Sequence, residues 1–182
     1  MTEDTQSVTT SGQQAEDFRW PIEFLAAEHD RQRVLCAALE RLAGDVGGAG
    51  AAEAARQILD YFETKLGLHY GDEEKGLFPL LRRRAEPDDG IGTILDLLDE
   101  EHEADHVLLD RLLGPLRAIA GGGRPTDLIG FAGDARAFSV LQRRHLAWEN
   151  GTVLALARRR LSADDQRELG RGMAARRGLA LP

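Results

Sequence analysis

The sequence predicts an all-α protein, an antiparallel up-down-up-down four-helix bundle with a short C-terminal fifth helix. Clusters rich in Gly, Pro and Asp at residues 44–48, 86–90 and 121–125 separate long segments rich in Ala, Leu, Arg and Glu, which are strong helix formers. No segment shows sustained polar–apolar alternation or an Asn-Gly hairpin signal, so strands are not expected. Four long helices joined by short loops favour the antiparallel bundle.

The first predicted helix begins near Pro21, because proline suits the first helical position. It ends at the glycine cluster of residues 44–48. Its apolar residues and its histidine recur at helical spacing and fall approximately on one face. These residues are Ile22, Leu25, Ala26, His29, Val34, Cys36 and Leu39.

The second predicted helix runs from about residue 51 to residue 84, with apolar residues recurring at helical spacing along its length. Gly67, Gly71 and Gly76 weaken its middle, because glycine is a poor helix former. Pro79 predicts a kink in its last turns.

The third predicted helix covers about residues 91–120, with a second kink expected at Pro115. The fourth covers about residues 127–160. A shorter fifth helix follows Ser162, which reads as an N-cap because acidic residues occupy the first turn behind it.

Composition excludes several classes of function. The 31 acidic residues outnumber the 23 Lys and Arg residues and give a net charge of −8, which argues against non-specific binding to nucleic acid. Two runs of three arginines, residues 82–84 and 158–160, close the second and fourth helices. Cations complement the carbonyl end of a helix, so these runs do not indicate a nucleic-acid site.

The chain of 182 residues is long enough for one domain with a substantial core, expected over residues 18–178. Residues 1–17 are polar and predict a disordered tail. The single cysteine, Cys36, allows no internal disulfide and is expected to be a small core residue in a reducing compartment. Neither a signal peptide nor an apolar run near the ~20 residues of a membrane span is evident, so a cytoplasmic protein is expected.

The histidines are the residues whose spacing indicates a functional site. The chain has five, and every one lies on a predicted helix: His29, His69, His102, His106 and His145. Two of them stand four residues before a glutamate, in the pairs His69/Glu73 and His145/Glu149, and the two histidines of the third helix are also four residues apart. Side chains at this spacing share one face of a helix.

In a four-helix bundle these seven side chains can point inward at one level. A mononuclear zinc site needs about four ligands, so seven are too many for one ion. Imidazoles and carboxylates cannot lie unpaired in an apolar core, because burying a charge without a partner costs several kcal/mol. Mixed imidazole and carboxylate donors suit iron, zinc, manganese or copper, and two bridging carboxylates would hold a pair of ions ~3.5 Å apart.

The stretch His-Tyr-Gly-Asp-Glu-Glu-Lys-Gly-Leu-Phe-Pro-Leu at residues 69–80 resembles the signature of the hemerythrin-like, or HHE cation-binding, family. Residues 27–30 (Ala-Glu-His-Asp), 101–102 (Glu-His) and 145–150 (His-Leu-Ala-Trp-Glu-Asn) resemble the other three elements of the family, in the same order. The resemblance covers about residues 20–160.

This resemblance implies an oxo- or hydroxo-bridged di-iron centre in the bundle core, although other divalent metals remain possible. The histidines of the third and fourth helices would hold one iron, those of the first and second would hold the other, and the two glutamates would bridge both. The implied ligands are His29, His69, Glu73, His102, His106, His145 and Glu149. The iron with fewer histidines would keep an open position, where hemerythrins bind dioxygen.

The sequence departs from the invertebrate oxygen carriers in two places. Its second bridging acid is Glu149 at i+4, whereas those carriers use Asp at i+5, which is Asn150 here. Ala155 stands where many relatives repeat the Phe-Pro-like ending of the second helix. The match is therefore to the bacterial branch, whose activities are diverse.

The resemblance implies a protein that binds dioxygen or a related small ligand for sensing, storage or delivery, with neither nucleic acid nor membrane as partner. Two alternatives stay open. One is an enzyme that reduces peroxide or nitric oxide, with Tyr70 and Trp148 as candidate electron relays. The other is an iron-responsive regulatory module, in which metal stabilises the fold and alters a partner surface.

Two competing metal motifs fit the chain less well. Residues 102–106 match the His-Glu-x-x-His pattern of metalloproteases. That interpretation leaves His29, His69, Glu73 and Glu149 unexplained and calls for a cleft edged by a strand, which nothing in the chain predicts. A ferritin-like di-iron oxidase uses Glu-x-x-His pairs and a carboxylate-rich set, whereas most donors here are imidazoles.

Overall fold

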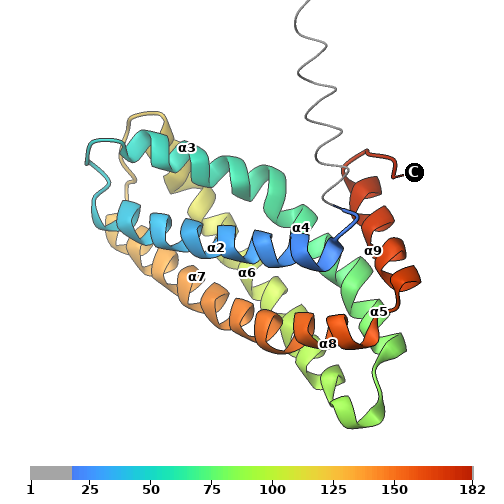
Figure 1. The fold of residues 1–182 in the computed structure, drawn as a ribbon. Helices are drawn as coiled ribbons and strands as arrows, with labels where there is room; N and C mark the ends of the chain where they lie inside the picture. The colour runs from blue at the N-terminus through green and yellow to red at the C-terminus, as the bar shows by residue number, and fades with distance from the viewer. Residues whose placement is uncertain (1–17, 182) are drawn as a thin grey trace, which may run out of the picture.

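A computed structural model describes residues 18–181, and all its regular secondary structure is helical (Figure 1). The first helix, α2, covers Pro21–Gly44, and α6, the longest purely α-helical segment, covers Ile91–Ala120. The last, α9, covers Ala163–Arg176, and a short 3₁₀ turn, η3, covers Pro87–Asp89. The predicted all-α class is confirmed for the described residues. The predicted tail at residues 1–17 lies outside them.

The second long helix runs without a break through five segments. These are α3 (Ala51–Tyr61), η1 (Phe62–Leu66), α4 (Gly67–Asp72), η2 (Glu73–Leu77) and α5 (Phe78–Arg84). Its ends agree with the predicted residues 51–84. The segments η1 and η2 are π-helical turns, which widen the helix locally and occur often at functional sites. No pattern in the sequence predicts these π-helical turns.

The fourth long helix has the same construction. It consists of α7 (Leu128–Trp148), a π-helical turn η4 (Glu149–Val153) and α8 (Leu154–Arg160). Asp127 is its N-cap, and the carboxylate accepts a hydrogen bond from the amide of Gly130 at 2.8 Å. Ser162 caps α9 as predicted, in a capping box with Asp165.

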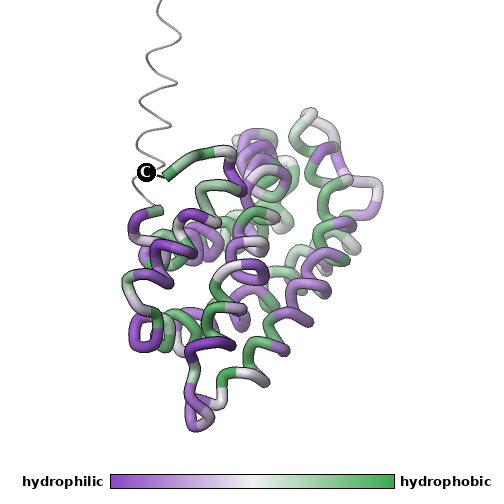
Figure 2. The backbone as a smooth tube through the Cα atoms, turned by 90° about the vertical axis from the view of Figure 1, so that its right-hand side faces the viewer, coloured by the Kyte–Doolittle hydropathy of each residue, from purple (hydrophilic) through white to green (hydrophobic). Residues whose placement is uncertain are grey.

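The long helices pack side by side around one interior (Figure 1). Helix α2 packs against α3 and α7, and α6 packs against the same two helices. The last helix, α9, lies across α2, α4 and η2. Hydrophobic and hydrophilic residues alternate in short stretches along the helices, as helices with one buried face require (Figure 2).

The core consists of two apolar clusters with a polar layer between them. Along α2, the apolar residues Ile22 and Leu25 belong to one cluster and Leu39 and Leu42 to the other. The same division occurs on α6, in the same order along the chain, and in the reverse order on the second and fourth long helices. Buried polar side chains occupy the stretch between the clusters on each helix.

The exposure of two side chains on α2 can be compared with the apolar face predicted for this helix. Cys36 is 2% exposed and lies in the second cluster, so it is a core residue as expected. Val34 is 66% exposed, and its assignment to the buried face was wrong. Val34 falls two residues before Cys36, and positions two apart point to different sides of a helix.

None of the helices within residues 18–181 combines the length and the apolar character that crossing a membrane requires.

Candidate metal centre

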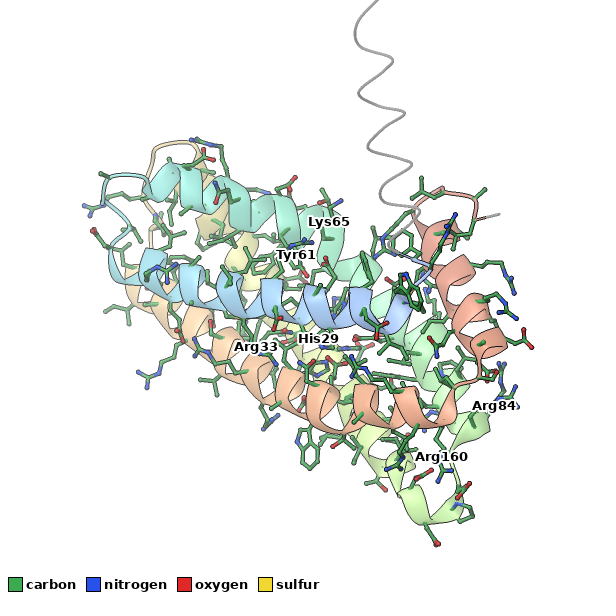
Figure 3. All side chains as sticks on the ribbon, in the orientation of Figure 1. His29, Arg33, Tyr61, Lys65, Arg84 and Arg160 are labelled. Atoms are coloured by element: carbon green, nitrogen blue, oxygen red, sulfur yellow. The ribbon has the colours of Figure 1, made fainter. Side chains whose placement is uncertain are left out.

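The polar layer brings six of the seven predicted ligands together. Their donor atoms form two groups, in each of which all atoms lie within 4.8 Å of one another. One group contains His29 and His69, the other contains His102 and His145, and Glu73 and Glu149 belong to both. All six side chains are at most 1% exposed. His29 lies on α2, near its middle, where this helix packs against α7 (Figure 3).

Glu73 divides its two oxygens between the two groups. Oε1 lies 3.2 Å from Nε2 of His29 and 3.4 Å from Nε2 of His69. Oε2 lies 3.5 Å from Nε2 of His102. A carboxylate with one oxygen toward each set of imidazoles has the orientation of a bridging ligand.

Glu149 has the same arrangement on the opposite helix. Oε2 lies 3.3 Å from Nε2 of His29, and Oε1 lies 3.3 Å from Nε2 of His145. The Nε2 atoms of His102 and His145 approach each other to 3.1 Å. In all four imidazoles the Nε2 atom thus faces the interior of the layer.

Local helix geometry explains why these side chains converge. Each glutamate follows its histidine by four residues, so the two side chains share one face. Each glutamate is also the first residue of a π-helical turn, η2 for Glu73 and η4 for Glu149. A π turn inserts an extra residue and changes which side chains face inward beyond it.

Several of the inward-facing nitrogen and oxygen atoms have no hydrogen-bonding partner within residues 18–181. Nε2 of His69, Oε2 of Glu73 and both carboxylate oxygens of Glu149 are buried and make no hydrogen bond within residues 18–181. An unpartnered buried polar atom costs about 1–3 kcal/mol, and more when it is charged. The donor set, four imidazoles and two carboxylates, fits a pair of transition-metal ions, and such ions would satisfy these atoms together.

Burial keeps three of the imidazoles in the metal-binding form. It lowers the pKa of His29, lowers that of His69 further, and lowers that of His102 to about 4. Neutral imidazole is the form that binds metals, because its Nε2 lone pair is free. Burial also opposes the charged form of His145, but the charges of Glu149 and Glu101 outweigh burial and raise its pKa to about 10.

The pKa values of Glu73 and Glu149 are shifted in opposite directions. Burial raises the pKa of Glu73 well above its ordinary value, and the nearby charge of Glu149 raises it further. Burial also acts to raise the pKa of Glu149, but His145 and His29 outweigh it and the pKa falls. The Glu73 carboxyl therefore holds its proton more strongly than the Glu149 carboxyl does.

Two further carboxylates lie next to the Nδ1 atoms of His102 and His145, on the side of each ring away from the interior of the layer. Glu74 Oε1 lies 2.8 Å from Nδ1 of His102, and Glu101 Oε2 lies 3.0 Å from Nδ1 of His145. Arg144 holds Glu101 through an ion pair of 2.6 Å. Neither glutamate belongs to the ligand set predicted from the sequence. Their positions beside Glu73 and His102 were the only available signal.

A buried hydrogen-bond network next to His102 was not predicted. The hydroxyl of Tyr70 donates to Oδ2 of Asp105 at 2.9 Å, and the Gln142 amide donates to Tyr70 at 3.0 Å and also to Asp105. The Tyr70 ring stacks on the His102 ring with centroids 4.2 Å apart. Burial raises the pKa of Asp105 to about 6. Neither Asp105 nor Gln142 belongs to a motif, so only the fold reveals them.

His106 is the predicted ligand that the structure does not bring to the layer. Its side chain is exposed, and it belongs to neither group of donor atoms. The buried face of α6 passes through His102 and Asp105, and a residue four positions after His102 is rotated about 40° from it. That rotation leaves His106 at the surface, at the edge of the Tyr70 ring. The ligand set proposed below therefore has six members.

Residues 21–157 match the family described as the hemerythrin HHE cation binding domain. The chain belongs to this family. The match reaches from the start of α2 into α8 and includes all six residues of the layer, so the hemerythrin HHE assignment and the geometry concern the same site. A search of the curated proteins found no significant match.

The hemerythrin HHE match ends before α9. This helix still belongs to the folded core, because Leu169, Met173 and Ala174 are buried in the first apolar cluster. Members of the family bind cations, and two groups of His and Glu in this chain could hold them.

Proposed function

We propose that this protein holds a di-iron centre and binds dioxygen or a related small ligand, such as nitric oxide or peroxide, for sensing, storage or delivery. The observation that carries the proposal is the division of the carboxylate oxygens of Glu73 and Glu149 between two sets of imidazoles. Two carboxylates so placed support a pair of ions rather than one ion.

The fold supports the same proposal. The order of the two apolar clusters reverses from each long helix to the next, which favours an antiparallel up-down-up-down bundle. Each helix then contributes to the polar layer at its middle, between two apolar layers that exclude water. We extend the domain to residue 178, because α9 packs on this core.

Each residue of the layer has a defined role in this proposal. His29 and His69 would hold one ion, and His102 and His145 the other. Bound iron would supply a reversible change of oxidation state and a coordination position for the ligand. Because the six side chains are at most 1% exposed, only a small ligand can reach them without opening the fold.

The test is rapid mixing of the reduced, iron-loaded protein with oxygen, followed by its visible spectrum. The expected result is a charge-transfer band that appears on mixing and disappears on removal of oxygen. His69→Ala should abolish the band, while His106→Ala should leave it unchanged because His106 lies outside the layer. Immediate irreversible oxidation of the wild-type protein would contradict reversible binding.

One observation favours a second candidate, an enzyme that reduces peroxide or nitric oxide. Tyr70 is buried, stacks on His102 and donates its hydroxyl hydrogen to Asp105, which places an oxidisable ring beside a candidate ligand. Peroxide reduction to water consumes two electrons and two protons, which an added reductant and solvent would supply. Steady-state consumption that falls in Tyr70→Phe and vanishes in His69→Ala would favour this candidate. Its absence in the wild type would eliminate it.

We place the protein in the cytoplasm. The single cysteine is free, and a free cysteine without a disulfide suits a reducing compartment.

A further inference from the structure

The two halves of the proposed centre differ in how their imidazoles are held. In the half formed by His102 and His145, both Nδ1 atoms meet a carboxylate, Glu74 at 2.8 Å and Glu101 at 3.0 Å. In the half formed by His29 and His69, neither Nδ1 atom has a hydrogen-bonding partner within residues 18–181.

The two halves differ in the residue that directly follows each bridging glutamate. Glu74 directly follows one bridging glutamate and contacts His102. Asn150 directly follows the other bridging glutamate, and it places a neutral amide rather than a carboxylate near His29. The amide nitrogen of Asn150 instead donates to the backbone oxygen of Leu146 at 2.9 Å.

The glutamates that directly precede His102 and His29 also differ in their contacts, and only the first of them contacts an imidazole of the layer. Glu101 directly precedes His102 and contacts Nδ1 of His145. Glu28 directly precedes His29, but its carboxylate is taken by the hydroxyl of Tyr61 at 3.2 Å and by an ion pair with Arg31. Glu28 is therefore not available to His69.

The rings are also held unequally. The His102 ring stacks on Tyr70 at 4.2 Å, and Phe78 lies parallel to it at 6.1 Å, with an interplanar angle of 10°. The His29 ring meets the edge of the His69 ring at 5.1 Å. The two rings of each half also contact each other, and Tyr70 lies 6.0 Å from the His69 ring. The difference is that two aromatic rings lie nearly parallel to His102 and restrict its orientation.

A carboxylate on Nδ1 acts directly on metal affinity. It fixes the hydrogen on Nδ1, leaves the Nε2 lone pair free for the metal, and makes the imidazole a stronger donor. Loss of such a partner typically lowers metal affinity about 10- to 100-fold. Two halves that share both bridging carboxylates but differ in these partners should therefore differ in affinity.

We propose that the two metal positions are filled in a fixed order: the His102/His145 position binds first and tightly, and the His29/His69 position binds second and exchanges its ion. Glu74 and Glu101 are the positioning residues that set this order. The inference rests on the proposed function, because it presumes that the layer binds metal. It assigns the exchangeable half to the face of the layer formed by α2 and α4.

The experiment uses the full-length metal-free protein and cobalt(II) as the probe. One equivalent of cobalt is added, and its position is located by anomalous diffraction from crystals. Titration calorimetry then measures the affinities of both positions. The expected result is cobalt at His102 and His145, with affinities that differ about tenfold or more.

Two single substitutions form a matched pair. Glu74→Gln removes a carboxylate from His102 at a partly exposed position, and it should weaken the first binding step about tenfold or more. Asn150→Asp offers a carboxylate to His29 at nearly unchanged size, and it should strengthen the second step. Thermal unfolding of each metal-free variant verifies that the fold is retained. A variant that only disturbed the fold would weaken both steps.

The outcomes separate this inference from the proposed function. Cobalt found first at His29 and His69, equal occupancy of both positions, or unchanged affinities in Glu74→Gln would overturn the order of filling and leave a two-metal centre intact. Failure to bind either cobalt or ferrous iron would overturn the proposed function, and the inference with it.

Discussion

At the scale of single residues, Glu73 and Glu149 determine what the polar layer can do. Each presents one oxygen to His29 and the other to an imidazole of the opposite half. Shortening or neutralising one of these side chains would leave a single carboxylate between the two sets of imidazoles, and loss of both would leave two separate pairs of histidines. The layer would then lose the feature that distinguishes a site for two ions from a site for one.

The i,i+4 spacing could predict that His69 and Glu73 share one helix face and that His145 and Glu149 share another. His29 has no such partner, and only its place on the first helix of the bundle predicted that it joins the others. The same rule misplaced His106, since the rule says that two side chains are neighbours but not which of them faces the core. His102 lies inside and His106 outside. Asp105 and Gln142 could not be predicted, because their contact depends on the packing of α6 against α7.

A carboxylate at the start of α9 gives a prediction about pH. The guanidinium of Arg84 and the Ser162 hydroxyl lower the pKa of Asp165 from 3.8 to about 2. Since the pKa is lower in the folded state, the ionised carboxylate stabilises the fold above about pH 4, and this contribution disappears as the pH falls toward 2.

Urea unfolding of wild type and Asp165→Asn measures the effect. The wild type should be more stable at pH 7, and the difference should shrink by pH 3. Asparagine keeps an acceptor for the cap, so the comparison isolates the charge contact with Arg84, which spans 2.8 Å. A difference that is the same at both pH values would contradict this account.

At the scale of elements, the arginine runs at the ends of α5 and α8 form ion pairs with neighbouring elements. Arg84 and Arg160 lie at the same end of the molecule (Figure 3). Arg84 pairs with Asp165 at the start of α9, and Arg160 pairs with Glu86 and Asp89 in the turn before α6. The sequence predicted cations at these helix ends but not their partners, which lie far away in sequence.

Helix α9 gives a prediction about close packing. A side chain at Gly170 would overlap the backbone oxygen of Phe18, whereas Gly133 on α7 has open space around it. Gly170→Ala should therefore lower the free energy of unfolding by about 1–3 kcal/mol. Gly133→Ala should raise it by up to about 1 kcal/mol, because alanine is the better helix former.

Chemical unfolding of the two alanine variants provides the measurement, with each variant serving as the control for the other. Equal effects of both substitutions would show that the contact between α9 and Phe18 does not constrain the fold.

At the scale of the whole molecule, the end of helix α9 is joined to the polar layer through Asp72. Arg176 donates to Asp72 at 2.7 Å, and Arg177 donates to the same carboxylate at 3.1 Å. Asp72 lies on α4 between His69 and Glu73. A metal ion that orders these two residues would thereby also order the contact with α9, as the regulatory alternative requires.

Thermal unfolding with and without metal tests this coupling. Metal at 100 times its dissociation constant should add about 2.7 kcal/mol to the free energy of unfolding. For a domain of this size, that corresponds to a rise in Tm of roughly 5–10 °C. Limited proteolysis should show the same protection near α9. Equal Tm values and equal resistance in both states would contradict coupling between metal and fold.

The most direct test of the two-metal centre is the metal content of protein purified from iron-replete cells, measured together with its visible spectrum. The account predicts about two irons per chain, held by four imidazoles and two carboxylates, and a clear loss of iron in Glu73→Gln. A protein without bound metal, or one with a single zinc held only by His102 and His106, would contradict it.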